Sequence, residues 1–246
     1  MDDTFDLVDV VLLTLLPALG SILGVALAEW RKPSAWLTGT ALHMAAGIAT
    51  GVAAVELVPR AQERGETWLL ALAIIGGALL SVVLVSLSRR LRKGKGEGSE
   101  VLWGAYTAII IDLFSDGLMT GGGGAVAAYL GVLLGASQVF GNLPGGFAIT
   151  AGFREAGISR RKRLIAACSY PLAPVAGGVG GFLILDGASD ALTGFVLALF
   201  AGLLLTATIE DLVPEADAPG ASRKLSSPAF AVGFVLLLLM SSYLEA

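Results

Sequence analysis

Long apolar stretches dominate this chain and leave few folds open to it. Hydrophobic residues make up 55% of its 246 residues and charged residues only 15%, whereas soluble domains carry roughly 25% charged residues. A transmembrane helix needs about 20 predominantly apolar residues, and the chain holds eight such stretches. We therefore predict an all-α polytopic membrane protein, a single domain over 1–246 with eight transmembrane helices. The expected spans cover approximately residues 7–29, 35–58, 67–88, 101–121, 125–152, 162–185, 190–213 and 226–244.

The distribution of lysine and arginine predicts the orientation of these spans. Fourteen of the 16 basic residues lie in the connections after the first, third, fifth and seventh spans, and only Arg60 and Arg64 lie elsewhere. Connections rich in lysine and arginine remain in the cytoplasm, so we expect both termini outside. The acidic stretch 1–6 lacks the basic region of a signal peptide. We expect a multi-pass protein of a cytoplasmic (inner) membrane.

Two phrases far apart in the chain match each other. Stretches 46–61 and 201–216 both contain Ala-Gly followed by Leu-Val-Pro-x-Ala, and the glycine and proline are twelve residues apart in each. The expected topology places these phrases in oppositely directed spans, which is the arrangement of an inverted repeat in transporters. We predict a 3+2+3 repeat, with halves over about 1–88 and 162–246 and central helices over about 101–152.

Carboxylates inside the predicted spans are candidates for function. Asp112 and Asp116 are four residues apart, so a helix places both on one face. A charge at mid-bilayer costs at least ~2.5 kcal/mol, and two neighbouring carboxylates repel unless a cation or proton lies between them. This pair predicts a cation or proton site. Glu56, Glu210 and Asp211 lie in the matched phrases, and we interpret them as pathway residues or as solvated helix ends.

The fifth span offers neutral oxygen ligands beside this pair. Pro144 cannot donate to the carbonyl of Phe140, so we expect a kink there and a free backbone oxygen. The Asn142 amide oxygen and this carbonyl would suit a hard cation. His43 is the only histidine and Cys168 the only cysteine, which excludes sites with two imidazoles or a disulfide within one chain. His43 is interpreted as an exit-side ligand or a hydrogen-bonded helix contact.

These motifs resemble those of the ZIP (Zrt/Irt-like) metal transporters. Stretch 112–117 (Asp-Leu-Phe-Ser-Asp-Gly) is similar to the family's helix 4 motif His-Asn-x-Pro-Glu/Asp-Gly. Stretch 141–146 (Gly-Asn-Leu-Pro-Gly-Gly) is similar to its helix 5 motif His/Gln-Asp/Glu-x-Pro-Glu-Gly. The resemblance covers nearly the whole chain and implies eight helices with a 3+2+3 inverted repeat. It also implies that Glu210 and Asp211 match a metal-contacting pair on helix 7.

The chain departs from the family pattern at several ligand positions. Asp112 replaces the helix 4 histidine, whereas Asp116 keeps the acidic ligand. Gly141 stands at the first helix 5 ligand and Gly145 at the bridging glutamate, while Gly117, Pro144 and Gly146 match the motif residues at their positions. The resemblance therefore implies a reduced metal site of Asp112, Asp116 and Asn142 with water.

The resemblance implies a membrane transporter that moves divalent metal cations into the cytoplasm, not an enzyme. Zinc favours nitrogen and sulfur ligands, whereas carboxylate, amide and water suit magnesium, manganese or ferrous iron. The partners expected are membrane lipid, the ion and a second copy in a homodimer, and not nucleic acid. Three alternatives stay open: a different solute, a non-transporting relative with decayed ligands, and an intramembrane aspartyl hydrolase. The hydrolase is disfavoured because Asp112 and Asp116 share one helix.

Overall fold

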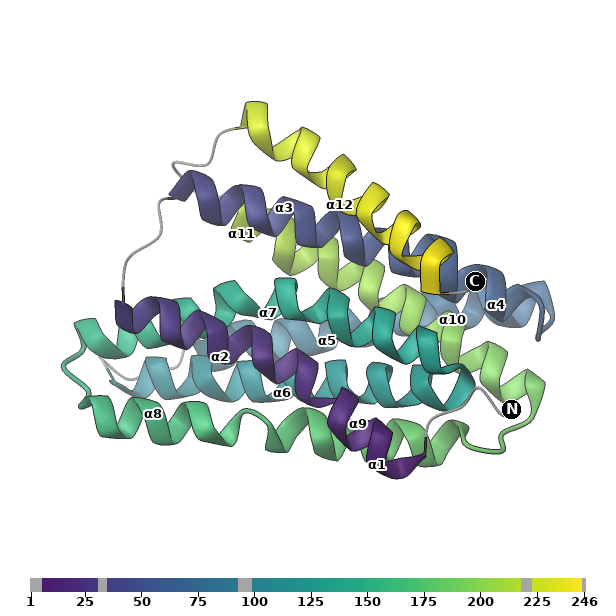
Figure 1. Ribbon diagram of the computed structural model, residues 1–246, viewed down its shortest axis with the longest axis horizontal. Helices are drawn as coiled ribbons and strands as arrows, with labels where there is room; N and C mark the ends of the chain where they lie inside the picture. Colours follow the sequence, from purple (N-terminus) through teal and green to yellow (C-terminus); the bar gives the residue numbers. More distant parts are fainter. Residues whose placement is uncertain (1–5, 31–34, 93–98, 218–222, 245–246) are drawn as a thin grey trace.

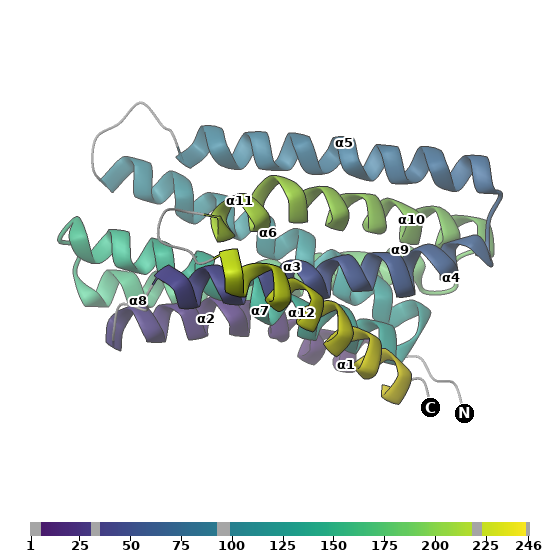
Figure 2. The same ribbon diagram turned by 90° about the horizontal axis from the view of Figure 1, so that it is seen from above.

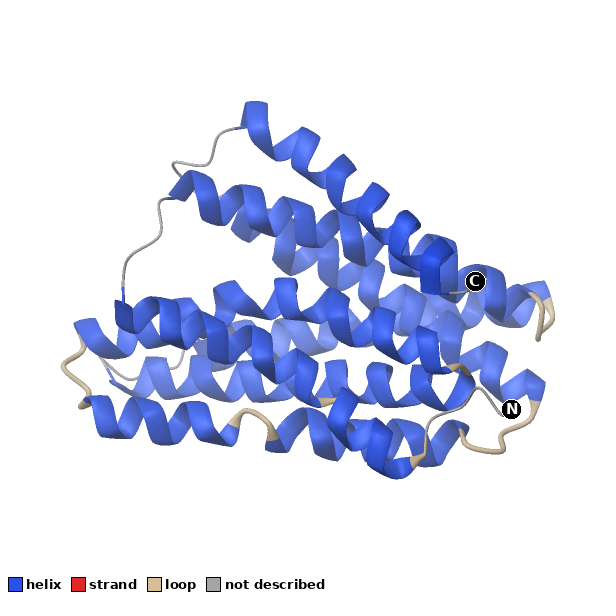
Figure 3. Ribbon diagram, in the orientation of Figure 1, coloured by secondary structure: helices blue, strands red, loops and turns tan. Residues whose placement is uncertain are grey.

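The computed structural model describes residues 6–30, 35–92, 99–217 and 223–244, and over these ranges it consists of helices joined by short turns and loops, with no strand (Figure 3). Eight helical rods run between the two ends of one bundle and alternate in direction (Figures 1 and 2). The rods are α1 with α2 (Leu7–Leu13, Leu15–Trp30), α3 with η1 and α4 (Ala35–Gly51, Val52–Leu57, Val58–Gln62), α5 (Thr67–Arg92), α6 (Ser99–Val126), α7 (Ala128–Glu155), α8 with α9 (Arg160–Ser169, Leu172–Leu185), α10 with η2 and α11 (Asp190–Ala207, Thr208–Leu212, Val213–Ala216), and α12 (Arg223–Leu244). The all-helical fold and the eight helices are confirmed.

Six of the rods are long and apolar enough to cross a membrane. They are the rods at 7–30, 36–62, 67–87, 128–155, 160–185 and 190–216, and α12 adds a shorter apolar stretch, Ser227–Tyr243. The chain is therefore a multi-pass membrane protein. The rod α6, which carries Asp112 and Asp116, is not among the six, so its crossing remains a prediction.

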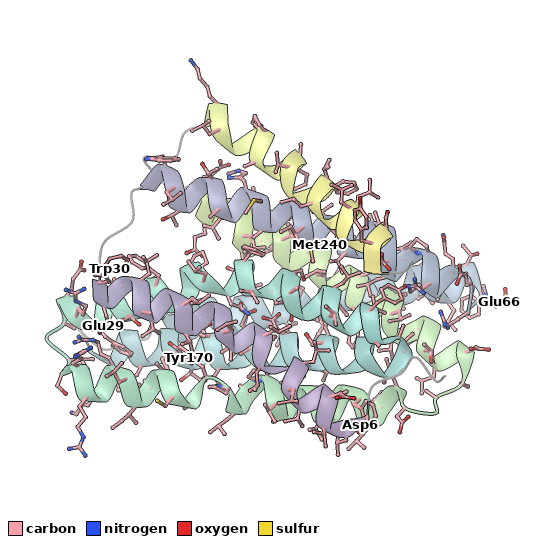
Figure 4. The ribbon with its side chains drawn as sticks, in the orientation of Figure 1. Asp6, Glu29, Trp30, Glu66, Tyr170 and Met240 are labelled. Carbon is pink, nitrogen blue, oxygen red and sulfur yellow. The ribbon has the colours of Figure 1, made fainter. Side chains whose placement is uncertain are left out.

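Helices that carry basic residues at their ends meet at one end of the bundle. This basic end contains the end of α2 near Glu29 and Trp30, whereas Asp6 and Glu66 lie at the opposite end (Figure 4). The ends of α5 and α7 and the starts of α8 and α12 also lie at the basic end (Figures 1 and 2). Glu29 binds Arg163 there, with Oε1 2.6 Å from Nε, and this pair joins α2 to α8.

Three local features differ from the sequence prediction. The first rod breaks at Thr14, three residues before Pro17, and the sixth breaks at Tyr170 and Pro171, which lie four and three residues before Pro174. A proline removes its own amide donor and crowds the carbonyl four residues earlier, which explains a break near that position. The expected turn after residue 121 is wrong, because α6 continues through four glycines to Val126.

The rods associate in two groups. In one group α6 packs most closely on α9, and α2 packs on α7; in the other, α10 packs on α5 and α12 on α3. The packing of α6 on α7 links the pairs of the first group, and α5 with α6 and α3 with α7 connect the groups. The region near the middle of α6 and α7 lies where the two groups meet.

Glycine allows the backbones in each pair to touch. A Cβ atom at Gly47 would lie 2.0 Å from the Phe230 carbonyl oxygen, and one at Gly202 would lie 2.0 Å from that of Ile74. Such contacts have no room for a side chain. Small residues of this kind drive association in a bilayer, where lipid is as apolar as a leucine side chain.

Corresponding glycine contacts occur in rods that are far apart in sequence. Gly24 lies against the carbonyl of Leu143, and Gly181 lies against that of Leu118. Further contacts of this kind pair Gly20 with Val139, Gly177 with Phe114, Gly146 with Ser21, Gly121 with Gly178, Gly77 with Leu199, Gly233 with Met44 and Gly117 with Pro174. Each of these contacts that a glycine of the first three rods or α7 makes thus has a counterpart. A glycine of the last three rods or α6 makes that counterpart at the equivalent position in its helix.

Two adjacent glycines of α5 provide a test of this packing. A Cβ atom at Gly77 would lie 2.0 Å from the Leu199 carbonyl oxygen, whereas one at Gly76 would meet nothing within 4 Å. We expect Gly77→Ala to destabilise the fold by about 1–3 kcal/mol through overpacking. Gly76→Ala should leave stability unchanged or raise it by up to ~1 kcal/mol through helix propensity. Thermal unfolding in detergent, followed by circular dichroism, measures both; equal midpoints would contradict the packing.

Candidate functional site

A small cavity of about 80 Å³ lies among α3, α6, α7, α10 and η2. Asp112 and Asp116 of α6 line it together with Asp211 of η2, and Asn142 lines it from α7. A second cavity, of about 60 Å³, also contains the three aspartates and adjoins α5. The aspartates therefore lie between two small cavities near the middle of the bundle.

Asn142 holds Asp116 in place. Its amide nitrogen Nδ2 donates to Asp116 Oδ2 at 2.6 Å and to the Pro17 carbonyl oxygen at 3.2 Å. Asp116 is 8% exposed, and a hydrogen bond to a charged group of this kind is worth about 1.5–3 kcal/mol. The structure therefore puts Asn142 against Asp116 through its nitrogen, whereas the sequence analysis expected the amide oxygen to face a cation.

The π-helical turn η2 presents Asp211 to the cavity. The Val213 amide donates to the Thr208 carbonyl five residues earlier, and this wider turn comes immediately before Pro214. The turn η1 has the same form, with the Val58 amide donating to the Ala53 carbonyl immediately before Pro59. Single π-helical turns occur often at functional sites. The sequence analysis missed both turns, although the Leu-Val-Pro phrases mark their positions.

Gln138 is a cavity residue that the sequence analysis also missed. Its side chain is 6% exposed, its Oε1 accepts from the Thr120 hydroxyl at 2.8 Å, and its Nε2 has no hydrogen-bond partner. Ser81 Oγ, in the second cavity, is likewise buried without a partner. A buried polar group left unsatisfied costs about 1–3 kcal/mol. The signal available in sequence was the spacing of Gln138 four residues before Asn142.

The other predicted residues lie at different distances from this cavity. Glu56 is 2% exposed and accepts from Arg60 Nε and from the Tyr129 hydroxyl, both at 3.3 Å, and from the Ser241 hydroxyl. The Arg60 guanidinium also lies 4.6 Å from the centre of the Tyr129 ring. These contacts join η1, α7 and α12 nearer the end of the bundle that lies opposite the basic end. Glu56 is thus part of a buried network away from the aspartates.

His43 lies on the basic side of the cavity. Its Nε2 is 3.6 Å from Asp217 Oδ1, and its Nδ1 is 2.9 Å from the Gly39 carbonyl oxygen. These contacts fit the interpretation of a hydrogen-bonded helix contact. Glu210 is half-buried on η2, next to Asp211, but it does not line either of the two described cavities.

The glycines of stretches 112–117 and 141–146 fall into two kinds, those that packing requires and those that it does not. A Cβ atom at Gly117 would lie 2.0 Å from the Pro174 carbonyl oxygen and one at Gly146 would lie 2.1 Å from that of Ser21, so packing requires both glycines. At Gly141 a Cβ atom would meet nothing within 4 Å, and at Gly145 only ordinary contact with Ile109. The helix α7 continues through Pro144 as a single element. Gly141 and Gly145 are therefore not required by packing.

The atoms at the cavity that could bind a metal ion are oxygens of carboxylates, amides and hydroxyls. Among the described residues, no three His, Cys, Asp or Glu side chains lie close enough together to hold a metal ion. A cation bound here would take its remaining ligands from neutral oxygens and water, as hard divalent ions do. The cavity can accommodate a few water molecules at about 30 Å³ each.

No protein-family model matches the chain, and no curated protein sequence is significantly similar to it.

The contact between Asn142 and Asp116 leads to a stability test. We expect Asn142→Leu, which keeps the size of the side chain and removes the amide, to lower the free energy of unfolding by about 1–3 kcal/mol. Ser115→Ala is the control, because the Ser115 hydroxyl bonds only within its own helix, to the Ile111 carbonyl at 3.2 Å. Thermal unfolding in detergent compares the two variants. An Asn142→Leu midpoint equal to that of the control would show that the contact contributes nothing.

Proposed function

We propose that this protein is a ZIP-like transporter that moves divalent metal cations across a membrane into the cytoplasm. The observation that carries this proposal is that Asp112, Asp116 and Asp211 all line two adjoining cavities at the middle of an apolar bundle. Ionisable residues at such depth are expensive and mark ion pathways. The ion is the substrate, and the carboxylates compensate for water that it sheds on entry.

An inverted repeat, with spans 1–3 related to spans 6–8, is part of the proposal. Its support is a set of matched features: broken first and sixth rods, π-helical turns before Pro59 and Pro214, and glycine contacts in the same register. By this register Glu56 corresponds to Asp211. Transporters with such repeats bind substrate near the bilayer midplane and alternate access by moving one bundle against the other.

The two groups of helices suggest what moves. The aspartates of α6 belong to one group, and Asp211 of η2 belongs to the other. A shift between the groups would change how many carboxylates face the ion at once. The network around Glu56 connects the same two groups of helices near the end of the bundle opposite the basic end. An ion that enters from that end requires the contact between Glu56 and Tyr129 to open.

The chemistry of the donors favours oxygen-seeking ions. Carboxylate, amide and hydroxyl oxygens suit magnesium and manganese better than zinc, which favours nitrogen and sulfur. We therefore expect magnesium or manganese to be transported better than zinc, with ferrous iron between them.

Uptake into proteoliposomes tests the proposal. We expect Mn²⁺ uptake by the wild-type protein and at least a tenfold lower rate for Asp116→Asn, because removing one charge at a buried site weakens binding strongly. Asp190→Asn is the matched control, since the Asp190 side chain is 89% exposed, 3.9 Å from Arg64. Folding of each variant is checked by its elution and helicity.

A non-transporting relative is the competing proposal. It is favoured by the absence, within the described residues, of three converging metal-ligating side chains. If well-folded wild-type protein takes up none of magnesium, manganese, ferrous iron or zinc, the transport proposal fails and this alternative gains.

Labelling of single cysteines tests the proposed orientation. In a Cys168→Ser background, we expect Glu66→Cys to react with a membrane-impermeant maleimide in intact cells, because Glu66 lies at the end opposite the basic residues. Arg161→Cys should react only after the cells are permeabilised, since basic connections stay in the cytoplasm. The reverse pattern would overturn the orientation, and with it the direction of transport.

A further inference from the structure

The Gln138 amide is the buried group that the fold leaves unexplained. Its nitrogen Nε2 is buried in the apolar bundle without a hydrogen-bond partner, and the same side chain lines the cavity of Asp112 and Asp116. Buried polar side chains in folded proteins nearly always have a partner. An unpaired amide that faces a cavity of carboxylates therefore indicates a ligand that is bound there during function.

The neighbour of Gln138 allows its amide to take two orientations. The Thr120 hydroxyl donates to Gln138 Oε1 at 2.8 Å. A hydroxyl both donates and accepts, whereas an amide carries an acceptor on one side and a donor on the other. Thr120 can therefore hold the amide equally well by accepting from Nε2, which turns Oε1 towards the cavity.

The register of α6 and α7 places this pair beside the aspartates. Gln138 lies four residues before Asn142 on α7, and Thr120 lies four residues after Asp116 on α6. Asn142–Asp116 and Gln138–Thr120 are thus successive hydrogen bonds between α6 and α7, about one helical turn apart. Gly141 lines the cavity as well, and nothing lies within 4 Å of the position of its missing Cβ. The cavity therefore has open space at Gly141, three residues after Gln138 on α7.

We propose that Gln138 is a ligand of the transported cation and supplies the neutral oxygen that Gly141 cannot. With an oxygen-preferring divalent ion such as Mg²⁺ or Mn²⁺ beside Asp112 and Asp116, the amide turns its oxygen to the ion and its nitrogen to Thr120. This role rests on the proposed cation transport. It also explains how a site with few carboxylates reaches the number of oxygen ligands that such ions take.

Binding of Mn²⁺ to the purified full-length protein tests this role independently of transport. The free ion is measured by its electron paramagnetic resonance signal during titration. Gln138→Leu, which removes the amide at similar size, should weaken the affinity at least tenfold. Gln62→Leu is the matched control: it is the same substitution at an exposed glutamine of α4 that lines neither of the two cavities. Its affinity should equal that of the wild type.

Substitution by glutamate provides the second variant. Gln138→Glu has the same shape and brings a carboxylate to the ligand position, so the affinity for Mn²⁺ should rise at least threefold, and Mg²⁺ should compete for the site. This variant decides the question if Gln138→Leu does not fold.

The outcomes separate the two proposals. In one outcome the wild type binds Mn²⁺, Asp116→Asn abolishes that binding, and Gln138→Leu or Gln138→Glu leaves the affinity unchanged. In that case the cation site is supported, but Gln138 is not one of its ligands. If the wild-type protein binds no Mn²⁺, the ligand role of Gln138 and the cation site both fail.

Discussion

Direct contact between helix backbones is the constraint on which the rest of this structure depends. In a bilayer, apolar side chains gain little by leaving lipid, so close packing has to hold the rods together. Gly146 lies against the carbonyl of Ser21, and Gly117 lies against that of Pro174. These contacts bring α7 onto α2 and α6 onto α9. The close approach of α7 to α2 lets the Asn142 amide, which donates to Asp116 of α6, also reach the Pro17 carbonyl.

The eight rods could be predicted from sequence because hydrocarbon thickness sets the length of each apolar stretch. The breaks within the rods could not, because they depend on a local balance between proline geometry and neighbouring helices. Pro17 and Pro174 lie three residues after Thr14 and Pro171, but membrane helices also continue through a proline, as α7 does at Pro144. The turn expected after residue 121 is wrong for a related reason: four glycines continue α6 because α7 and α9 pack against them.

The candidate site was predictable only in part. Asp112 and Asp116 had to share a face because of their spacing, and the structure places both on the cavity with Asn142. The spacing gave no information on partners across helices. Asn142 therefore donates to Asp116 where an oxygen ligand was expected, and Gln138 was overlooked because its significance lies in a contact it lacks. Sequence patterns report covalent neighbours, whereas unsatisfied atoms appear only once the helices are assembled.

One side chain connects the interrupted first helix to a carboxylate. The Asn142 amide holds the Pro17 carbonyl, three residues beyond the break at Thr14, and with the same nitrogen it holds Asp116. The amide nitrogen carries two hydrogens, so it serves both acceptors at the same time. The buried carboxylate of α6 and the part of the first rod that follows its break are therefore fastened to a single side chain of α7.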